Sequence, residues 1–159
     1  MIRQATLFDL NVLWEMWLAL TGEEASKELE HGREPYPCVT LQDKEAWAID
    51  TSIALTSPTS CFLIAENAGH AVGFMVSSAQ SRTVGAPRHY LFISQLYVRP
   101  AERKHSGGNI AAQLCSESER WAREHQLAQV ECLAVQANIP LWESRGLRVV
   151  AAHMTKDLV

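Results

Sequence analysis

Hydrophobic residues recur along this chain with two different spacings, and the first is the spacing of a helix. Steps of three and four residues, which keep side chains on one helical face, run through residues 10–18, 41–55 and 110–122. The second of these patterns is the least regular. Asp9 precedes the first pattern and is predicted to be its N-cap. The third predicts a helix that buries Ile110, Ala111, Leu114, Cys115, Trp121 and Ala122.

The second spacing is that of β-strands, which stand out as short runs of β-branched, aromatic and aliphatic residues. They predict strands at residues 2–6, 61–65, 71–76, 92–98, 129–135 and 149–154. Residues 66–69 are expected to form a hairpin turn and residues 82–89 a loop. Pro100 ends the central strand because proline cannot donate to a ladder. A short helix at residues 141–147 ends at Gly146, where a left-handed cap is favourable.

This order of elements predicts an α+β fold, and composition limits its function classes. The 159 residues fit one domain over residues 1–159, with an ordinary 47% of hydrophobic residues. A net charge of −4 argues against a nucleic-acid partner, which would favour a basic surface. Neither a long apolar span nor a leader pattern is present, so membrane insertion and secretion are not indicated. Four cysteines without paired metal spacing indicate a reducing, cytoplasmic setting.

A basic loop with two glycines separates the central strand from the central helix. It contains Arg103, Lys104 and His105, followed by the sequence SGGN at residues 106–109. A helix start offers free N–H groups and the positive end of the peptide dipoles, and glycines let a ligand approach them. The loop is therefore predicted to hold a phosphate or pyrophosphate; the alternative is a turn beside solvated charges. Neither a GxxxxGK(S/T) sequence nor a GxGxxG directly after a strand occurs.

Together, the strand, the V-x-P-x-x-R sequence at residues 98–103, the glycine loop and the helix resemble the cofactor motif of the GNAT superfamily of N-acetyltransferases. That motif is written Q/R-x-x-G-x-G/A. The hairpin FLIAE-NAG-HAVGF at residues 62–74 resembles the second and third GNAT strands. The order of elements is similar to the family along nearly the whole chain. The resemblance implies a mixed, mostly antiparallel central sheet flanked by helices, with splayed fourth and fifth strands.

The resemblance implies acetyl-CoA as the cofactor, with its pyrophosphate on the loop and its pantetheine arm along the preceding strand. The loop is longer than the family's, so the motif can be counted from either end. Counted from the strand, it is filled by Arg103, Ser106 and Gly108; counted from the helix, by Ser106, Asn109 and Ala111. The cofactor-binding residues implied in this way are Leu96, Val98, Arg103, Lys104, Ser106, Gly107, Gly108, Asn109, Ile110, Ala111 and Asn138.

In the family the acetyl group passes directly to the amine, helped by a polarising N–H group and a general base. The resemblance places that N–H group at Leu96, Tyr97 or Val98. The family's usual carboxylate position falls on Ser94 and Gln95, neither of which takes a proton at neutral pH. The alternatives for the base are a water chain, a glutamate of residues 21–34, Glu131, His89 or His105.

The general acid departs from the family pattern as well. The tyrosine that often protonates the departing thiolate aligns with Trp142, whose indole is not an acid. Tyr97, Ser144 or solvent can protonate a thiolate instead, because a thiol is a tolerable leaving group. The residues predicted to be catalytic are Tyr97, Glu131 and Gln95.

Residues 21–34 contain five acidic and two basic residues, a net charge of −3. This is either a solvated surface or an acidic wall that attracts a cationic amine. The resemblance implies that the region forms one side of the acceptor site. The predicted partner is a small cationic amine, aminoglycoside-like or polyamine-like, or a peptide amine. No nucleic-acid or membrane partner is expected. A homodimer is compatible with the sequence. The alternatives are a catalytically weak acyl-CoA-binding or sensing module and an unrelated α+β interaction domain.

Overall fold

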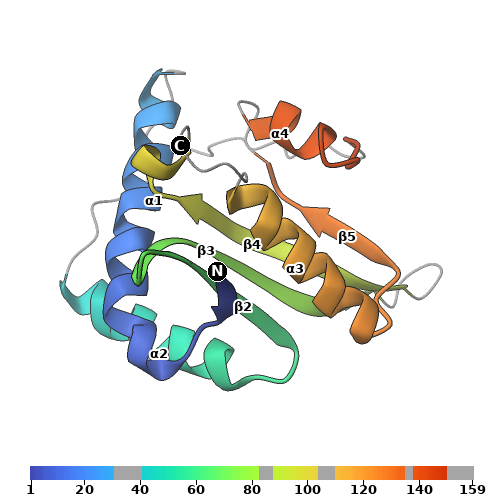
Figure 1. Cartoon of the computed structure of the whole chain (residues 1–159), viewed down its shortest axis with the longest axis horizontal. Coiled ribbons are helices and arrows are strands. Elements are labelled where there is room, and N and C mark those ends of the chain that lie inside the picture. Colours follow the sequence, from blue (N-terminus) through green and yellow to red (C-terminus); the bar gives the residue numbers. More distant parts are fainter. Residues whose placement is uncertain (31–40, 83–87, 104–109, 135–137, 150–159) are drawn as a thin grey trace, which may run out of the picture.

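A five-stranded sheet lies between two layers of helices (Figure 1). This computed structural model describes residues 1–30, 41–82, 88–103, 110–134 and 138–149. The helices are α1 (Leu10–Glu30), α2 (Leu41–Thr56), α3 (Ile110–Glu124) and α4 (Ile139–Glu143). Helices α1 and α2 cover one face of the sheet and α3 covers the other. The predicted α+β class is confirmed.

The sheet is mixed but mostly antiparallel. Its strands, in spatial order, are β1 (Ile2–Gln4), β2 (Ser60–Asn67), β3 (His70–Arg82), β4 (Arg88–Val98) and β5 (Gln129–Cys132). Strands β1 to β4 pair antiparallel, whereas β4 and β5 pair parallel. The predicted hairpin turn between β2 and β3 is confirmed, with positive φ at Ala68 and Gly69.

A β-bulge lies in the middle of β4. Ile93 lies opposite Ser77 of β3, and the next β4 residue with a partner on β3 is Gln95, opposite Val76. Ser94 is therefore the extra residue of the bulge. A bulge bends its strand and increases the local twist, so it changes the direction of β4 at this point.

The bulge coincides with the point where β4 and β5 separate. The last parallel pair is Ile93 with Cys132, and β4 continues to Val98. We call residues 90–93, which pair with both neighbouring strands, the paired segment of β4. We call residues 94–98 the open segment; it begins with the bulge residue Ser94, and residues 95–98 pair only with β3. This arrangement is the predicted splay of the fourth and fifth strands.

The bulge also reverses the face to which alternate β4 residues point. Leu91 and Ile93 are buried in the cluster under α3, whereas Tyr97 is buried in the cluster under α1 and α2. Val98 returns to the α3 side. Side chains alternate strictly along a regular strand, so without the extra residue Tyr97 would face α3. One inserted position thus decides which helix Tyr97 faces.

Helix α1 packs on the sheet through the apolar face that its sequence predicts. Leu13 and Met16 are fully buried. The rings of Trp14 and Trp17 stack at 5.2 Å, and both contact Trp47 of α2. These aromatic contacts join the two helices into one layer. No helix in the described part of the chain is both long and apolar enough to cross a membrane.

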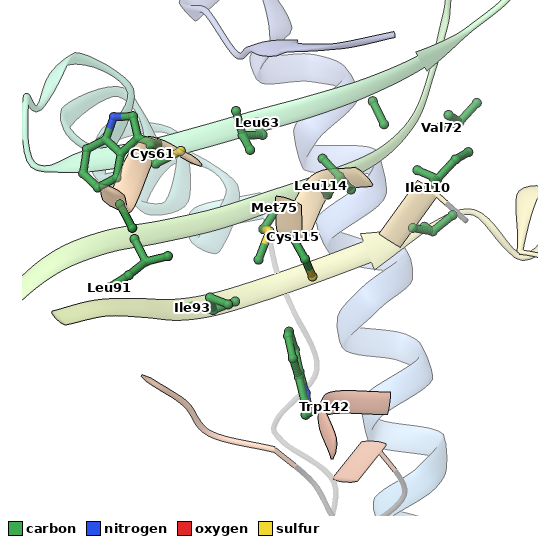
Figure 2. Packing of buried hydrophobic residues seen from close by; sticks show 14 residues of the cluster. Cys61, Leu63, Val72, Met75, Leu91, Ile93, Ile110, Leu114, Cys115 and Trp142 are labelled. Carbon is green, nitrogen blue, oxygen red and sulfur yellow. The ribbon is translucent and has the colours of Figure 1, made fainter. Parts of the chain in front are cut away.

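Figure 2 shows the cluster on the other face, where Leu114 and Cys115 of α3 lie against the strands near Met75. The predicted buried face of α3 is confirmed. One polar contact lies within this apolar layer: the hydroxyls of Ser77 and Ser118 are hydrogen-bonded at 2.7 Å and are fully buried. The pair satisfies two groups that would otherwise be buried without partners.

Helix α2 forms where expected, but it packs with a face that its sequence pattern does not indicate. Ile49 and Ile53, which helped to suggest the helix, are 63% and 64% exposed. The inward face contains Trp47, Thr51 and Leu55 instead. Apolar residues lie on both sides of this helix, so spacing alone could not choose the side that packs.

Several predicted strand ends were wrong. The loop expected at residues 82–89 is shorter, because Arg82 and Arg88 pair at the ends of β3 and β4. Residues 83–87 lie outside the described residues. Polar residues near the end of β3 resemble a loop in sequence, but a ladder needs only backbone partners. Strand β5 is shorter than expected and ends at Cys132.

Asp9 does not cap α1 with its side chain as predicted. It ends a short 3-10 helix (η1, Leu7–Asp9) that leads into α1. Its carboxylate accepts hydrogen bonds from the Arg3 guanidinium, at 2.8 Å to each oxygen, and from the Thr6 N–H group. The Arg3 side chain also donates to Glu66 of β2. Asp9 therefore anchors the beginning of α1 to β1 and β2.

The C-terminal elements agree with the sequence only in part. Helix α4 begins and ends earlier than the expected 141–147, and Gly146 has the predicted positive φ, 83°. Val149, at the start of the expected strand at residues 149–154, is not in a strand, and the rest of that prediction lies outside the described residues.

Candidate active site

The open segment of β4 directs backbone groups toward the side that β5 leaves free. The Arg99 N–H group donates to the Val72 carbonyl of β3 at 2.8 Å. Since hydrogen-bonded pairs alternate in an antiparallel ladder, the N–H and C=O groups of Leu96 and Val98 face away from β3. The Val98 carbonyl accordingly accepts a hydrogen bond from Nε of Arg103 rather than from β3. The edge of the open segment can therefore receive a ligand.

A groove of about 590 Å³ lies between α1 and the end of β4. Its lining residues are Ala19, Gly22, Glu23, Ser26, Lys27 and Glu30 of α1, together with Tyr97 and Pro100. The α1 residues recur at helical spacing and so form one continuous wall. A Cβ atom at Gly22 would meet nothing within 4 Å, so the groove is open at this position. We call this feature the α1–β4 groove.

Arg103 connects the groove to the open segment. Its Nη2 lies 2.8 Å from each carboxylate oxygen of Glu23, and its Nε donates to the Val98 carbonyl at 2.8 Å. Its guanidinium carbon lies 5.6 Å from the centre of the Tyr97 ring. Arg103 thus contacts α1, the open segment and the aromatic ring of the groove at once.

Tyr97 is the predicted catalytic residue that lines the groove. The residue is 4% exposed, and its ring lies 6.1 Å from that of Phe74. Burial raises the pKa of the Tyr97 hydroxyl, and the Glu23 carboxylate raises it further, whereas Arg103 and Arg99 oppose the rise. The hydroxyl therefore keeps its proton at neutral pH and can donate it. The ladder alternation directs the Tyr97 N–H group toward β3, away from the free edge.

The other two predicted catalytic residues lie in different places. Gln95 follows the bulge and lies half-buried in the open segment. Glu131 lies opposite Phe92, and its carboxylate forms an ion pair with Arg82 at 3.0 Å. Phe92 precedes Tyr97 by roughly 16 Å of strand, at about 3.3 Å per residue. The structure brings Gln95 and Tyr97 into one segment and leaves Glu131 apart from them.

The predicted cofactor residues are described only in part. Ile110 begins α3 and is buried, and Ala111 follows it half-buried. Asn138 immediately precedes α4, and its side chain does not cap that helix. The remaining loop positions lie outside the described residues, namely Lys104, Ser106, Gly107, Gly108 and Asn109, and so does the alternative base His105.

Two alternative acid or base residues, His89 and Ser144, and Trp142 make contacts of other kinds. Trp142, at the position of the family's tyrosine, is buried against the α3 cluster. Nδ1 of His89 shares a hydrogen bond with the Ser81 hydroxyl near the start of β4, far along the strand from the groove. The Ser144 hydroxyl donates to the Leu141 carbonyl at 2.6 Å. In this structure each therefore serves packing or local hydrogen bonding.

Sequence reasoning singled out the charged segment but did not identify which of its residues face β4. The residues of this segment that line the groove are Gly22, Glu23, Ser26, Lys27 and Glu30. Gly22 did leave a signal, since a glycine inside a helix is about 1 kcal/mol less favourable than alanine and therefore calls for a reason. The bulge at Ser94 left none, because serine has no special preference for it.

The profile of the acetyltransferase (GNAT) family matches residues 14–147 of the sequence. This chain belongs to the GNAT family. The match includes most of α1, the whole of β4 and α4, and therefore both walls of the α1–β4 groove. No curated protein sequence gives a significant match.

Solved structures show the same fold. A variant of the BH1408 protein from Bacillus halodurans aligns with a TM-score of 0.79 at 17% identity, covering 100% of this chain and 99% of that one. Glucosamine-6-phosphate N-acetyltransferase from Arabidopsis thaliana gives 0.68 at 12%, with 100% and 98% covered. An aminoglycoside acetyltransferase from an uncultured soil metagenomic sample, in complex with sisomicin, gives 0.66 at 13%, with 100% and 96% covered. At such identities the likeness concerns the fold.

Proposed function

We propose that this protein is an acetyl-CoA-dependent N-acetyltransferase that transfers an acetyl group directly to a primary amine. The observation that carries the proposal is the open segment of β4, which directs the Leu96 and Val98 backbone toward a free edge while Tyr97 lines the adjacent groove. A thioester and an amine must meet at one point, and the two sides of this segment offer a place for each. The proposed setting is the cytoplasm.

The residues present fit acetyl-CoA. When bound, the cofactor supplies the acetyl group as a thioester. We propose that the N–H groups of Leu96 and Val98 hydrogen-bond to it along the open segment. Ile110 and Ala111 begin a helix of 15 residues, whose first N–H groups suit an anion. The loop before that helix and Asn138 complete the proposed cofactor site.

We propose that the α1–β4 groove holds the acceptor amine. The acceptor class is a small cationic molecule, aminoglycoside-like or polyamine-like, or a peptide amine. Glu30 offers a carboxylate along one wall, the Glu23 carboxylate is held by Arg103, and Lys27 lies between these two residues, so the wall favours an acceptor with separated polar groups over a bare cation. The relative in complex with sisomicin supports the small-molecule reading by analogy alone.

Protons move with the transfer, and Tyr97 is the proposed donor. In the proposed transfer, the amine nitrogen would bond to the acetyl carbon as the carbon–sulfur bond breaks. The Tyr97 hydroxyl would give its proton to the departing sulfur, and a base in the groove would take the proton of the amine. Return of that proton through solvent would restore the Tyr97 hydroxyl. The raised pKa keeps the Tyr97 hydroxyl protonated at neutral pH, and it makes the hydroxyl a weaker acid than a free tyrosine. For the base we propose a groove carboxylate or water, because Glu131 is ion-paired and distant along the strand. Gln95 is proposed to orient groups by hydrogen bonding.

The test is release of free thiol from acetyl-CoA with a panel of amines. Gly22→Trp should fill the groove and abolish amine-dependent release, whereas Gly22→Ala, which meets no atom, should retain it. Tyr97→Phe keeps the ring but removes the hydroxyl, so kcat should fall about 100-fold while coenzyme A affinity stays unchanged. If Gly22→Trp acetylates every amine as fast as the wild type, the groove is not the acceptor site.

A second candidate function is that of a catalytically weak acyl-CoA-binding or sensing module. The position of the family's usual acid is Trp142, which is buried against α3, and Glu131 is committed to an ion pair. This alternative predicts that coenzyme A raises the unfolding temperature while no amine in the panel releases thiol. Amine-dependent thiol release with the coenzyme A shift would reject it.

A further inference from the structure

Arg103 makes an unusual set of contacts for a residue at the beginning of a phosphate-binding loop. It is the last described residue before that loop, and the family motif would direct it to a pyrophosphate. Its Nη2 is instead held by both oxygens of Glu23 and its Nε by the Val98 carbonyl, each at 2.8 Å. Its guanidinium also lies over the Tyr97 ring.

These contacts use the planar shape of the side chain. A guanidinium has donors in a fixed fork, and here one donor serves a carboxylate on α1 while another serves the backbone of the open segment. The charge is offset by Glu23, so little of it remains for a phosphate. The fork spans two elements distant in the sequence, and its guanidinium carbon lies 5.6 Å from the centre of the Tyr97 ring.

We propose that Arg103 is a positioning residue, which fixes the end of β4 and the Tyr97 ring against Glu23 and so governs use of the acceptor amine rather than affinity for the cofactor. This inference rests on the proposed acetyltransferase function for its kinetic consequence, but not for its structural one. It predicts that removing the fork disturbs Tyr97 even in the absence of any substrate.

The charged groups around Tyr97 provide a test that does not need activity. Glu23 of α1 raises the pKa of the hydroxyl, and Arg103 and Arg99, which follow β4, lower it. Lys27 and Glu30 of α1 line the same groove. Removing the two members of the ion pair should therefore shift the Tyr97 titration in opposite directions, which loss of folding would not do.

The first experiment is a spectroscopic titration of the tyrosine hydroxyls of the full chain, with Tyr97→Phe as the reference that isolates the Tyr97 signal. Arg103→Met should raise the pKa of Tyr97, because it removes a cation and leaves Glu23 unpaired. Glu23→Gln should lower it. Shifts in the same direction, or no shift in either variant, would overturn the proposal.

The second experiment separates positioning from phosphate binding. Arg103→Met should lower kcat/KM for the amine about tenfold or more, while coenzyme A affinity by calorimetry changes less than about threefold. Arg103→Lys keeps the charge but loses the fork, so it should not restore the amine kinetics. The control is Arg120→Met, which removes a cation on α3 that is paired with Glu117 and Glu124 away from the groove; its kinetics should stay close to wild type.

The opposite pattern would assign Arg103 to the cofactor. If Arg103→Met loses coenzyme A affinity about tenfold and Arg103→Lys regains it, the residue acts as a phosphate charge and the positioning proposal is wrong. If the wild type acetylates no amine at all, the proposed function fails, and the Tyr97 titration still decides whether Arg103 positions that ring.

Discussion

The two segments of β4 differ in almost everything except their partner β3. The paired segment, residues 90–93, is hydrogen-bonded on both edges and buries Leu91 and Ile93 under α3. The open segment, residues 94–98, has β3 on one edge only and turns Tyr97 toward α1. A single inserted residue, Ser94, separates them. Within one strand, the first segment supports the fold and the second is left available for chemistry.

This contrast shows how a small domain can keep a reactive edge without losing stability. An unpaired strand edge is normally a liability, because its backbone groups seek partners. Here the edge lies beside a groove wall and is partly occupied by Arg103. The neighbouring paired segment buries Leu91 and Ile93 under α3, and Tyr97 and Val98 of the open segment are buried as well. Substitutions in the two segments should therefore have separable effects.

Deletion of Ser94 should have the largest effect on the difference between the two segments of β4. Removing the extra residue would send Tyr97 toward α3 and Leu96 and Val98 toward the groove, so we expect loss of all thiol-release activity and a large fall in thermal stability. The control is Ser94→Ala, which keeps the bulge and loses only an exposed hydrogen bond to the Val76 carbonyl. A deletion variant that is folded and active would show that the bulge does not set the register.

Leu91→Ala acts on the paired segment alone. The side chain is fully buried, and truncation of such a residue lowers the free energy of unfolding by about 2–5 kcal/mol. We expect a lower midpoint in urea unfolding with kcat of the folded fraction unchanged. Leu91→Met, which conserves volume, should lose less than about 1.5 kcal/mol. A fall in kcat with stability intact would contradict the separation of the two segments.

Gly73→Ala acts on the open segment through β3. An added Cβ would lie 2.7 Å from the Tyr97 carbonyl oxygen and 3.3 Å from Val98, both in β4 backbone that cannot easily move. We expect a loss of about 1–3 kcal/mol in unfolding free energy, together with reduced thiol release. Gly22→Ala meets no atom and should instead stabilise α1 by about 1 kcal/mol. Equal behaviour of the two variants would refute the close packing at Gly73.

Lowering the pH should have the smallest effect, because it acts on the ion pair of Asp9 and Arg3, which lies outside both segments of β4. The Arg3 guanidinium lowers the pKa of Asp9 to about 2, below its usual value. The carboxylate therefore stabilises the folded state fully above about pH 4 and loses that contribution as pH falls toward 2, by about 2 kcal/mol. Asp9→Asn should lower the free energy of unfolding at neutral pH, measured in urea, and should reduce its further fall between about pH 4 and pH 2. If the fall between about pH 4 and pH 2 is the same in Asp9→Asn as in the wild type, the ion pair of Asp9 and Arg3 does not contribute to the acid dependence of stability.

The sequence predicted the fold where local pattern and tertiary packing agree. The buried face of α3, the turn at Gly69 and the left-handed Gly146 follow from spacing and backbone chemistry alone. The sequence-based prediction failed where a helix has apolar residues on two sides and only tertiary packing decides which side is buried. Ile49 and Ile53 have helical spacing but face outward, since Trp47 and its neighbours form the packed side of α2.

The candidate site was predictable to a lesser extent. Tyr97 was found because it lies in a recognisable motif next to the strand end. The ion pair of Arg103 with Glu23 was not predicted, because the two residues are 80 positions apart in the sequence and only the tertiary fold brings them together. The register shift at Ser94 was also hidden, since a bulge depends on the pairing of two strands rather than on either one.

The most direct measurement is the response of individual β4 backbone amides to coenzyme A, observed by NMR on the full chain. We expect the amide signals of Leu96 and Val98 to shift, with those of the paired segment, such as Leu91, unchanged. Saturating coenzyme A that leaves Leu96 and Val98 unmoved, or moves the paired segment instead, would contradict the claim that the open end of β4 is where the acetyl donor binds.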